Sequence, residues 1–294
     1  MKKGIKHIVL ALIALLGASS ASAQYYSWGA DSPSMKWQKL KGDKIDVIYP
    51  DTARSLGYKM MYYARAVQPS IDFGFRHGPM KIPFVIHPEN FSSNGMVMWL
   101  PKRVEILSSP AVNGYSMPWL KQLAAHEYRH AVQYNNLNKG FVRFFSYLLG
   151  QQSSTIGLLF MPLWMMEGDA VMTETEMSTF GRGLQPSFTM PYRAYGNVAN
   201  AFRNHDKWFC GSYKDYIPNH YNLGYLMSRH GYNRFGRIMG DDVAELTSRR
   251  PYMIISNNWV LRYLYGSSEA KLFYDPFHTL YYHWAPLAQV KETT

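Results

Sequence analysis

The sequence predicts an α+β protein in which a small α/β subdomain comes first and a mainly helical one follows. Two observations support this fold class. Short β-branched runs and one amphipathic helix fill the chain up to about residue 115, whereas helical periodicity dominates the remainder. Roughly 270 residues follow the N-terminal leader, which is enough for a sizeable core. We therefore place an N-terminal α/β subdomain at 24–115 and a helical subdomain at 116–294.

The first 23 residues have the pattern of a secretory signal peptide. Three lysines lie within residues 2–6, residues 8–16 are apolar, and the small residues Ala-Ser-Ala at 21–23 form a cleavage site. The apolar run is too short to span a bilayer, and no cysteine lies near the cleavage site to accept a lipid. We expect cleavage before Gln24, export to the periplasm, the outer membrane or the medium, and no transmembrane segment.

The first part of the chain alternates between strand and helix patterns. DKIDVIYP (43–50) alternates apolar and polar residues and stops at a proline, which predicts a strand. The segment 52–75 places apolar residues three or four apart, which predicts a helix that ends before Pro69. KIPFVIHP (81–88) and RVEILSSP (103–110) predict two further strands.

An Asn94-Gly95 pair lies between the last two of these strands and predicts a turn there. Beyond residue 116 the apolar residues follow helical spacing. The predicted helices lie near 117–136, 163–179, 221–230 and 256–264. The sequence contains no internal repeat and no low-complexity stretch that would indicate a different architecture.

Composition limits the classes of partner. With 31 Lys and Arg against 20 Asp and Glu, the formal charge is +11. The basic residues are scattered, with no run of five or more, so we expect no nucleic-acid groove. A basic surface that faces acidic partners, such as acidic glycans or lipid head groups, or that has no specific partner, remains open. Cys210 is the only cysteine, so no internal disulfide can form. Its aromatic context, WFCGSYKDY, predicts a buried structural thiol.

The stretch LKQLAAHEYRHAVQY (120–134) carries the first candidate site. His126 and His130 lie one helical turn apart on the same face, so both imidazoles can reach one metal ion. Glu127 lies beside them, where it can act as general base on a water molecule, as in the H-E-x-x-H arrangement of zinc hydrolases. Arg129 must turn away from the ion, toward a carboxylate or solvent. A surface helix with solvated histidines is the alternative.

A catalytic zinc ion needs three protein ligands and one open position. In PLWMMEGDAVMTETEM (162–177), Glu167 and Glu174 share one helical stripe with the apolar residues 170–171, so the stripe suits burial. A buried carboxylate needs a cation nearby, and a zinc ion held by the two histidines would provide that positive charge for Glu167. Glu174 is either an acceptor that orients a ligand histidine or an exposed glutamate, and the same alternatives hold for Asp169.

Together the two segments resemble the gluzincin metallopeptidases, the peptidase MA-like superfamily that includes thermolysin and the aminopeptidase N group. The matching residues are HEYRH (126–130) and WMMEGDA (164–170), and the W-x-x-E-G-x-A pattern is closer to the aminopeptidase N group. They also resemble exported bacterial proteins in which such a domain precedes a β-propeller. The resemblance implies a sheet over the active-site cleft and Glu127 as base. The ligands that it implies for one Zn²⁺ ion are His126, His130 and Glu167.

The resemblance continues in HYNLGYLMSRHGYNRFG (220–236). The aminopeptidase N group carries a Tyr-x-x-Gly at a similar distance past the third ligand, and its tyrosine stabilises the oxyanion. Tyr221 to Gly224 matches this pattern. A phenol near the zinc could donate a hydrogen bond to the developing oxyanion, and His220 is the alternative donor.

The segment 92–107 departs from the group. Aminopeptidases have a glycine-rich edge strand whose glutamate holds the free amine of the substrate. Asn94, Gly95 and Met96 match the strand, but no acidic residue follows at the corresponding place. We therefore expect an endopeptidase more than an aminopeptidase, with this strand pairing to an extended peptide.

The sequence thus predicts an exported zinc metallopeptidase that acts on peptide or protein substrates. The alternative is a catalytically inactive zincin-like binding or scaffold module, N-terminal to a propeller. The joint presence of ligands, base and oxyanion donor favours the enzyme, because an inactive relative usually lacks one of them.

Overall fold

The computed structural model describes most of the chain beyond the leader. The described residues are 31–77, 81–99, 101–112, 114, 116–150, 157–158, 160–196, 205–250 and 256–286. The signal peptide expected at 1–23 and the mature N-terminus at Gln24 lie outside them. Residues Lys36–Thr294 form one compact unit, which has the predicted α+β class. No helix among the described residues is both long and apolar enough to cross a bilayer.

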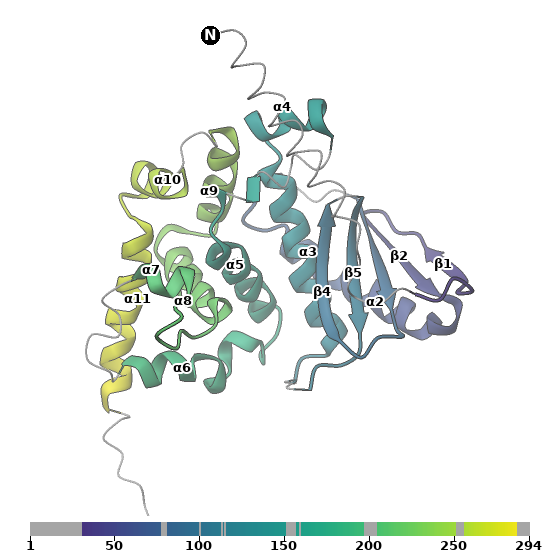
Figure 1. Cartoon of the computed structure of the whole chain (residues 1–294), viewed down its shortest axis with the longest axis horizontal. Coiled ribbons are helices and arrows are strands. Elements are labelled where there is room, and N and C mark those ends of the chain that lie inside the picture. The colour runs from purple at the N-terminus through teal and green to yellow at the C-terminus, as the bar shows by residue number, and fades with distance from the viewer. Residues whose placement is uncertain are drawn as a thin grey trace, which may run out of the picture. The chain divides into compact units, whose positions relative to one another are not determined.

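A five-stranded mixed sheet forms the N-terminal part of this unit (Figure 1). Its strands are β1 (Trp37–Leu40), β2 (Ile45–Pro50), β3 (Ile82–His87), β4 (Ser93–Trp99) and β5 (Lys102–Ser108), in the spatial order β1-β2-β3-β5-β4. β2, β3 and β5 run parallel, and β1 and β4 join antiparallel at opposite ends. The three predicted strands are confirmed as β2, β3 and β5.

The turn predicted at Asn94-Gly95 is wrong, because both residues lie within β4. They are in register with residues 106–107 of β5, and the chain turns instead at residue 101. Burial of Val97 and Trp99 on one face sets the register of the strand. Pairing along the whole strand outweighs the local turn preference of Asn-Gly.

α2 (Arg54–Ile71) packs against β2. The residues of α2 that are buried at helical spacing are Met60, Ala64, Val67 and Ile71. The expected end before Pro69 is wrong, because Pro69 lies inside the last turn. A proline there removes one N–H from the helical ladder only two residues before the helix ends, and burial of Ile71 stabilises that turn.

Three helices position the site: α3 (Trp119–Leu137), α5 (Leu163–Glu176) and α8 (His220–Phe235). In Figure 1, α3 lies between the sheet and the other large helices. With α10 (Ser256–Tyr265) these confirm the four helices predicted in the second half of the chain. Further described helices are α4 (Gly140–Leu149), α6 (Pro186–Gly196), α7 (His205–Cys210), α9 (Ile238–Arg249) and α11 (Glu269–Trp284), with the 3₁₀ turns η1 (Asp51–Ala53) and η3 (Arg182–Leu184).

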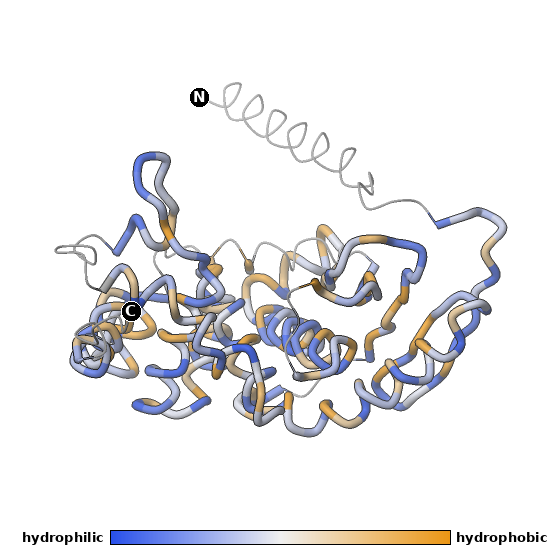
Figure 2. The backbone as a smooth tube through the Cα atoms, turned by 90° about the horizontal axis from the view of Figure 1, so that it is seen from below, coloured by the Kyte–Doolittle hydropathy of each residue, from blue (hydrophilic) through white to orange (hydrophobic). Residues whose placement is uncertain are grey.

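α3 lies between two hydrophobic cores. One core is formed by the sheet, α2 and part of α3, and the other by α5, α8 and the C-terminal helices. Figure 2 shows hydrophobic and hydrophilic positions alternating along most elements, as expected for elements that bury one face. Residues 122–133 of α3, however, are all buried. The alternative of solvated surface histidines is therefore excluded, and each charged group of this helix needs a partner.

The buried carboxylate of Glu105 on β5 allows the structure of the sheet to be tested by mutation. It is buried, accepts a hydrogen bond from Arg103 and lies 2.6 Å from His87 Nε2. Burial alone would raise the pKa of Glu105, but the bonds with His87 and Arg103 lower it below 4.5. A depressed folded-state pKa contributes stability above the unfolded-state value, and this stability is lost as the pH falls through the folded-state pKa.

We expect Glu105→Gln to lower the free energy of unfolding near neutral pH by about 1–3 kcal/mol. It should also flatten the loss of stability below pH 4.5, the ordinary pKa of this carboxyl. Urea denaturation at a series of pH values measures both effects. The exposed Glu89 is the control, since Glu89→Gln should change neither quantity. Identical acid-side slopes for wild type and Glu105→Gln would contradict this assignment.

Candidate metal centre

The three predicted ligand residues come together where α3 crosses α5. His126 and His130 project from one face of α3, and Glu167 projects from the first turns of α5. The Nε2 atoms of the two histidines lie 3.2 Å apart. Oε2 of Glu167 lies 3.2 Å from the Nε2 of His126 and 3.3 Å from that of His130. These residues form a group that could hold one metal ion.

The triangle of ligand atoms has the dimensions of a tetrahedral site. An ion with tetrahedral bonds of about 2.0–2.1 Å separates its ligand atoms by about 3.3–3.4 Å. The three observed separations are 3.2, 3.2 and 3.3 Å. Two nitrogens and one carboxylate oxygen suit a divalent ion of borderline softness. The donor set and its spacing therefore fit one small divalent cation.

The other ring nitrogen of each histidine is held by a different side chain. His126 Nδ1 lies 3.0 Å from Oε2 of Glu174, and His130 Nδ1 lies 2.8 Å from Oε1 of Gln133. Both partners offer an acceptor oxygen, so each Nδ1 is the protonated nitrogen. The Nε2 lone pairs are then free to face Glu167, and three electron-rich atoms converge on one point. Such a convergence needs a positive charge at its centre.

In the absence of an ion, a proton takes this role. Burial lowers the pKa of His126, but hydrogen bonding to Glu167 and Glu174 outweighs burial and raises the pKa to about 10. Burial would raise the pKa of Glu167, yet the two histidines hold it far below its ordinary value. A divalent ion and a proton therefore compete for the same nitrogen.

Glu174 lies at the centre of a buried charge group. It is fully buried and accepts two bonds from Arg182 of η3, at 2.6 Å from Nε and 2.9 Å from Nη2. Burial would raise the pKa of Glu174, but Arg182 and His126 hold it below its ordinary value. Of the two alternatives left open by the sequence, the exposed glutamate is therefore excluded, and Glu174 contacts a ligand histidine.

Asp169 does not contact a ligand histidine but pairs with Arg129. Arg129 is 0 % exposed, and its Nε and Nη2 donate to the two Asp169 oxygens at 2.6 and 2.8 Å. Its Nη1 donates to the backbone carbonyl of Ile71, the last residue of α2, and to that of Phe73 just beyond the helix. Arg129 thus turns away from the ligands toward a carboxylate, as expected from its charge, and joins α2, α3 and α5.

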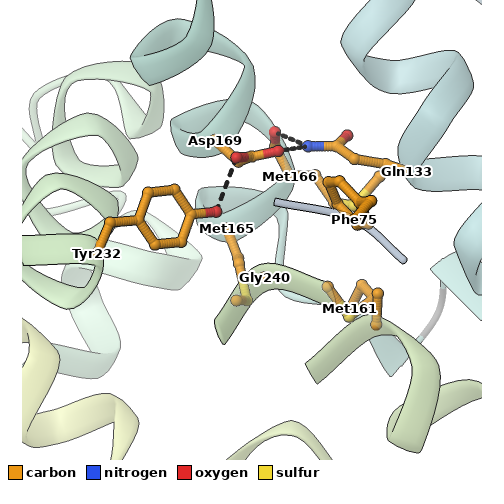
Figure 3. A pocket seen from close by; sticks show the side chains of 9 residues that line it. Phe75, Gln133, Met161, Met165, Met166, Asp169, Tyr232 and Gly240 are labelled. Carbon is orange, nitrogen blue, oxygen red and sulfur yellow. Dashed lines mark hydrogen bonds between the residues drawn. The ribbon is translucent and has the colours of Figure 1, made fainter. Parts of the chain in front are cut away.

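Figure 3 shows the remaining partners of Asp169. Nε2 of Gln133 donates to Asp169 at 2.6 Å and to the Met166 carbonyl at 3.0 Å, and the Tyr232 hydroxyl donates to Asp169 at 2.7 Å. Asp169 therefore acts on His130 only through Gln133. The cavity beside these residues measures about 10 Å³, which is space for one water-sized sphere, so it is too small for a substrate.

Glu127 lies directly beneath strand β4. Burial raises its pKa above 4.5, although His126 and His130 act in the opposite direction. A Cβ atom added to Gly95 would lie 2.6 Å from Cγ and 2.7 Å from Oε1 of Glu127. Only a glycine allows the strand to pass this close to the carboxylate. Asn94 and Met96 flank Gly95 on β4, which is an outer strand of the described sheet.

Tyr221 reaches the same group from α8. Its ring centroid lies 6.2 Å from that of His126, and the Arg182 guanidinium lies 5.5 Å from the ring. Burial, followed by the charge of Glu167, raises the pKa of Tyr221, so the phenol stays protonated. His220 lies next to Tyr221 and is half-buried, and burial lowers its pKa.

Two glycines determine how closely α8 approaches α5. A Cβ on Gly168 would lie 2.2 Å from the backbone of Gly224, and a Cβ on Gly224 would lie 2.0 Å from the carbonyl oxygen of Trp164. The backbones of the two helices are therefore in direct contact. Gly168 follows Glu167, and Gly224 lies three residues after Tyr221, so this contact brings the tyrosine to the third ligand.

Cys210 was predicted wrongly from the sequence, and two residues of the site, Gln133 and Arg182, were not predicted. Cys210 is exposed at the end of α7, so the prediction of a buried thiol is wrong: its aromatic neighbours, including the buried Trp208, pack inward without it. Gln133 was missed, although its place three residues after His130 put it on the same helical face. Arg182 lies in the short 3₁₀ turn η3, outside the predicted helices, and carried no local signal.

A scan against protein-family models finds no match for the chain, and a search of curated protein sequences finds none either. The assignment of the centre therefore depends on its own geometry.

The glycine contact gives a prediction about the assembled centre. An alanine in a helix interior normally stabilises by about 1 kcal/mol relative to glycine. Gly168→Ala should instead lower the free energy of unfolding by about 3 kcal/mol or more, because the new methyl group meets backbone atoms that cannot rotate away. Chemical denaturation measures this change, with Gly114→Ala as the control, where the nearest atom to an added Cβ is 3.5 Å away. A stability equal to or above wild type would refute the close crossing.

Proposed function

We propose that the protein is a zinc-dependent hydrolase of peptide bonds. The observation that carries the proposal is the buried triangle of His126, His130 and Glu167, with a buried fourth group, Glu127, directly after the first ligand. The triangle alone supports a metal centre. A general base beside it, under the outer strand of a sheet, supports hydrolysis.

Zinc bound by the three residues would supply a Lewis acid that polarises a carbonyl group and lowers the pKa of a water molecule. Glu127 is suited to take a proton from that water and to return it to the leaving amine. Burial raises the pKa of Glu127 above 4.5, which brings it closer to neutral pH and makes return of the proton easier.

Tyr221 is suited to hold the oxygen on which negative charge develops. It lies against His126 and interacts with Glu167, and its raised pKa keeps the hydroxyl proton available for donation. Arg182 packs on its ring and restricts its movement. His220 is adjacent on α8, but its lowered pKa leaves it mostly neutral and a weaker donor.

The outer strand β4 is suited to bind an extended peptide. Its residues Asn94, Gly95 and Met96 pass over Glu127, and a peptide added to the outer edge of the described sheet would present its carbonyl groups near the centre. Within the segment from 93 to 99, no acidic residue is present to hold a free amine. We therefore favour cleavage within peptides over removal of N-terminal residues, by an exported enzyme that resembles the gluzincins.

Glu127→Gln tests the role of the base. The variant should bind zinc in a one-to-one ratio, as is expected of wild type, because the three proposed ligands are unchanged. Its cleavage of a quenched fluorescent peptide mixture should fall by at least about 100-fold. The control is Glu176→Gln, an exposed glutamate of α5, which should cleave as wild type does.

Elemental analysis and a chelator separate the remaining outcomes. Wild-type cleavage should be lost with a chelator and restored by added zinc. Bound zinc without chelator-sensitive cleavage would refute the hydrolase and favour a binding or scaffold module. A chain that binds no zinc would refute the metal centre itself.

Gly95→Ala tests the placement of β4 over the base. The added methyl group overlaps Cγ of Glu127, so the carboxylate must move while the ligands stay in place. We expect zinc binding to be retained and the turnover number to fall by about tenfold or more. Gly95→Ala with wild-type turnover would show that Glu127 does not need this position.

A further inference from the structure

The helix α4 exposes large apolar side chains to solvent. Phe144 is 57 % exposed, Tyr147 73 % and Leu148 65 %. These positions are spaced i, i+3 and i+4, so the three side chains lie on one face of the helix. Val142 is the one side chain of α4 that is buried. Most helices of a globular protein bury their apolar face, whereas α4 presents one outward.

The N-terminal end of α4 is attached closely to the rest of the protein. Residues 138–139 connect it directly to α3, and it packs against α9. Gly140 adopts a φ of 48°, and a Cβ there would lie 2.7 Å from Cγ of Arg249. In Figure 1, α4 lies at the upper edge of the compact unit, beyond the end of α3. The exposed face is therefore carried on a firmly attached helix.

The charged residues on α4 and in its connection to α3 are all basic. Lys139 precedes the helix, Arg143 lies in its first turns, and no Asp or Glu occurs between Glu127 and Glu167. Burial and the nearby charge of Arg143 lower the pKa of Lys139, whereas the carboxylates of Glu245 and Asp241 on α9 act in the opposite direction. Arg249 is paired with Glu245, so it adds little to this group.

We propose that α4 is a membrane-surface helix that inserts its apolar face into the outer layer of a bilayer with anionic head groups. Phe144 and Leu148 would enter the acyl region, and Tyr147, whose hydroxyl accepts a hydrogen bond from Arg143 Nε at 3.1 Å, would lie at the head-group level. Lys139 and Arg143 would contact lipid phosphates. The helix has 10 residues, so it lies on a membrane and does not cross it.

The charges favour a lipid surface over a second copy of the chain. In a symmetric dimer through α4, Lys139 and Arg143 of one copy would meet no carboxylate on α4 of the other, because this helix carries no Asp or Glu. Without the three lysines of the expected leader the formal charge is still +8, which opposes association between copies. An anionic bilayer instead provides both the apolar layer and the opposite charge.

Vesicle flotation of the full chain tests the proposal. The probes are vesicles of phosphatidylcholine mixed with phosphatidylglycerol, and vesicles of phosphatidylcholine alone. Wild type should float with the mixed vesicles, and less so as salt is added. Phe144→Ser combined with Leu148→Ser should lower the partition coefficient by at least about tenfold, because two inserted side chains become polar. Thermal unfolding should remain that of wild type, since both positions are exposed.

The matched control lies on α2. Tyr58 and Tyr62 are also one turn apart and exposed, at 57 % and 70 %, so Tyr58→Ser with Tyr62→Ser should leave flotation unchanged. Arg143→Gln should weaken binding to the mixed vesicles and leave binding to the vesicles of phosphatidylcholine alone unchanged. Absence of wild-type flotation, or equal flotation of both double variants, would overturn the proposal. A concentration-dependent dimer that the Phe144/Leu148 variant abolishes, without vesicle binding, would assign the face to a second copy.

Discussion

The buried ion pair between Arg129 and Asp169 is the interaction on which the geometry of the centre depends. Isolated charges in such an interior would cost several kcal/mol each. Here Arg129 donates to two carboxylate oxygens and to two backbone carbonyls of the α2 segment, and its guanidinium lies 4.3 Å from the ring of Phe75. The pair therefore fixes α3 relative to α5 and to the end of α2. The relative placement of the histidines and Glu167 follows from that arrangement.

The ligand histidines are oriented by two different networks. Glu174, neutralised by Arg182, holds His126, whereas Gln133, held by Asp169 and a backbone carbonyl, orients His130. Both networks end on α5, the helix that also carries the third ligand. Since the side chains are fixed by protein contacts, little reorganisation would be needed for this group to hold an ion. Such pre-organisation also restricts which ion geometries the centre accepts.

The sequence was informative where periodicity and spacing act locally. The helices α3, α5 and α8 follow from apolar spacing, and the His-Glu-His-Glu group follows from the turn geometry of one helix plus one buried carboxylate on another. Tertiary contacts decided the rest. Asn94-Gly95 forms a strand because β5 pairs with it, Pro69 stays helical because Ile71 is buried, and Arg182 reaches Glu174 from the 3₁₀ turn η3. No window of sequence contains both partners of such contacts.

The contact between Gly168 and Gly224 also bears on how distant relatives can be identified. H-E-x-x-H is short and arises by chance, whereas two glycines more than fifty positions apart have no reason to occur together unless their helices touch. A search pattern that requires the Glu-Gly pair and the later Tyr-x-x-Gly jointly therefore selects for a shared crossing of two helices. Such a pattern would still identify related chains whose surface residues have diverged completely.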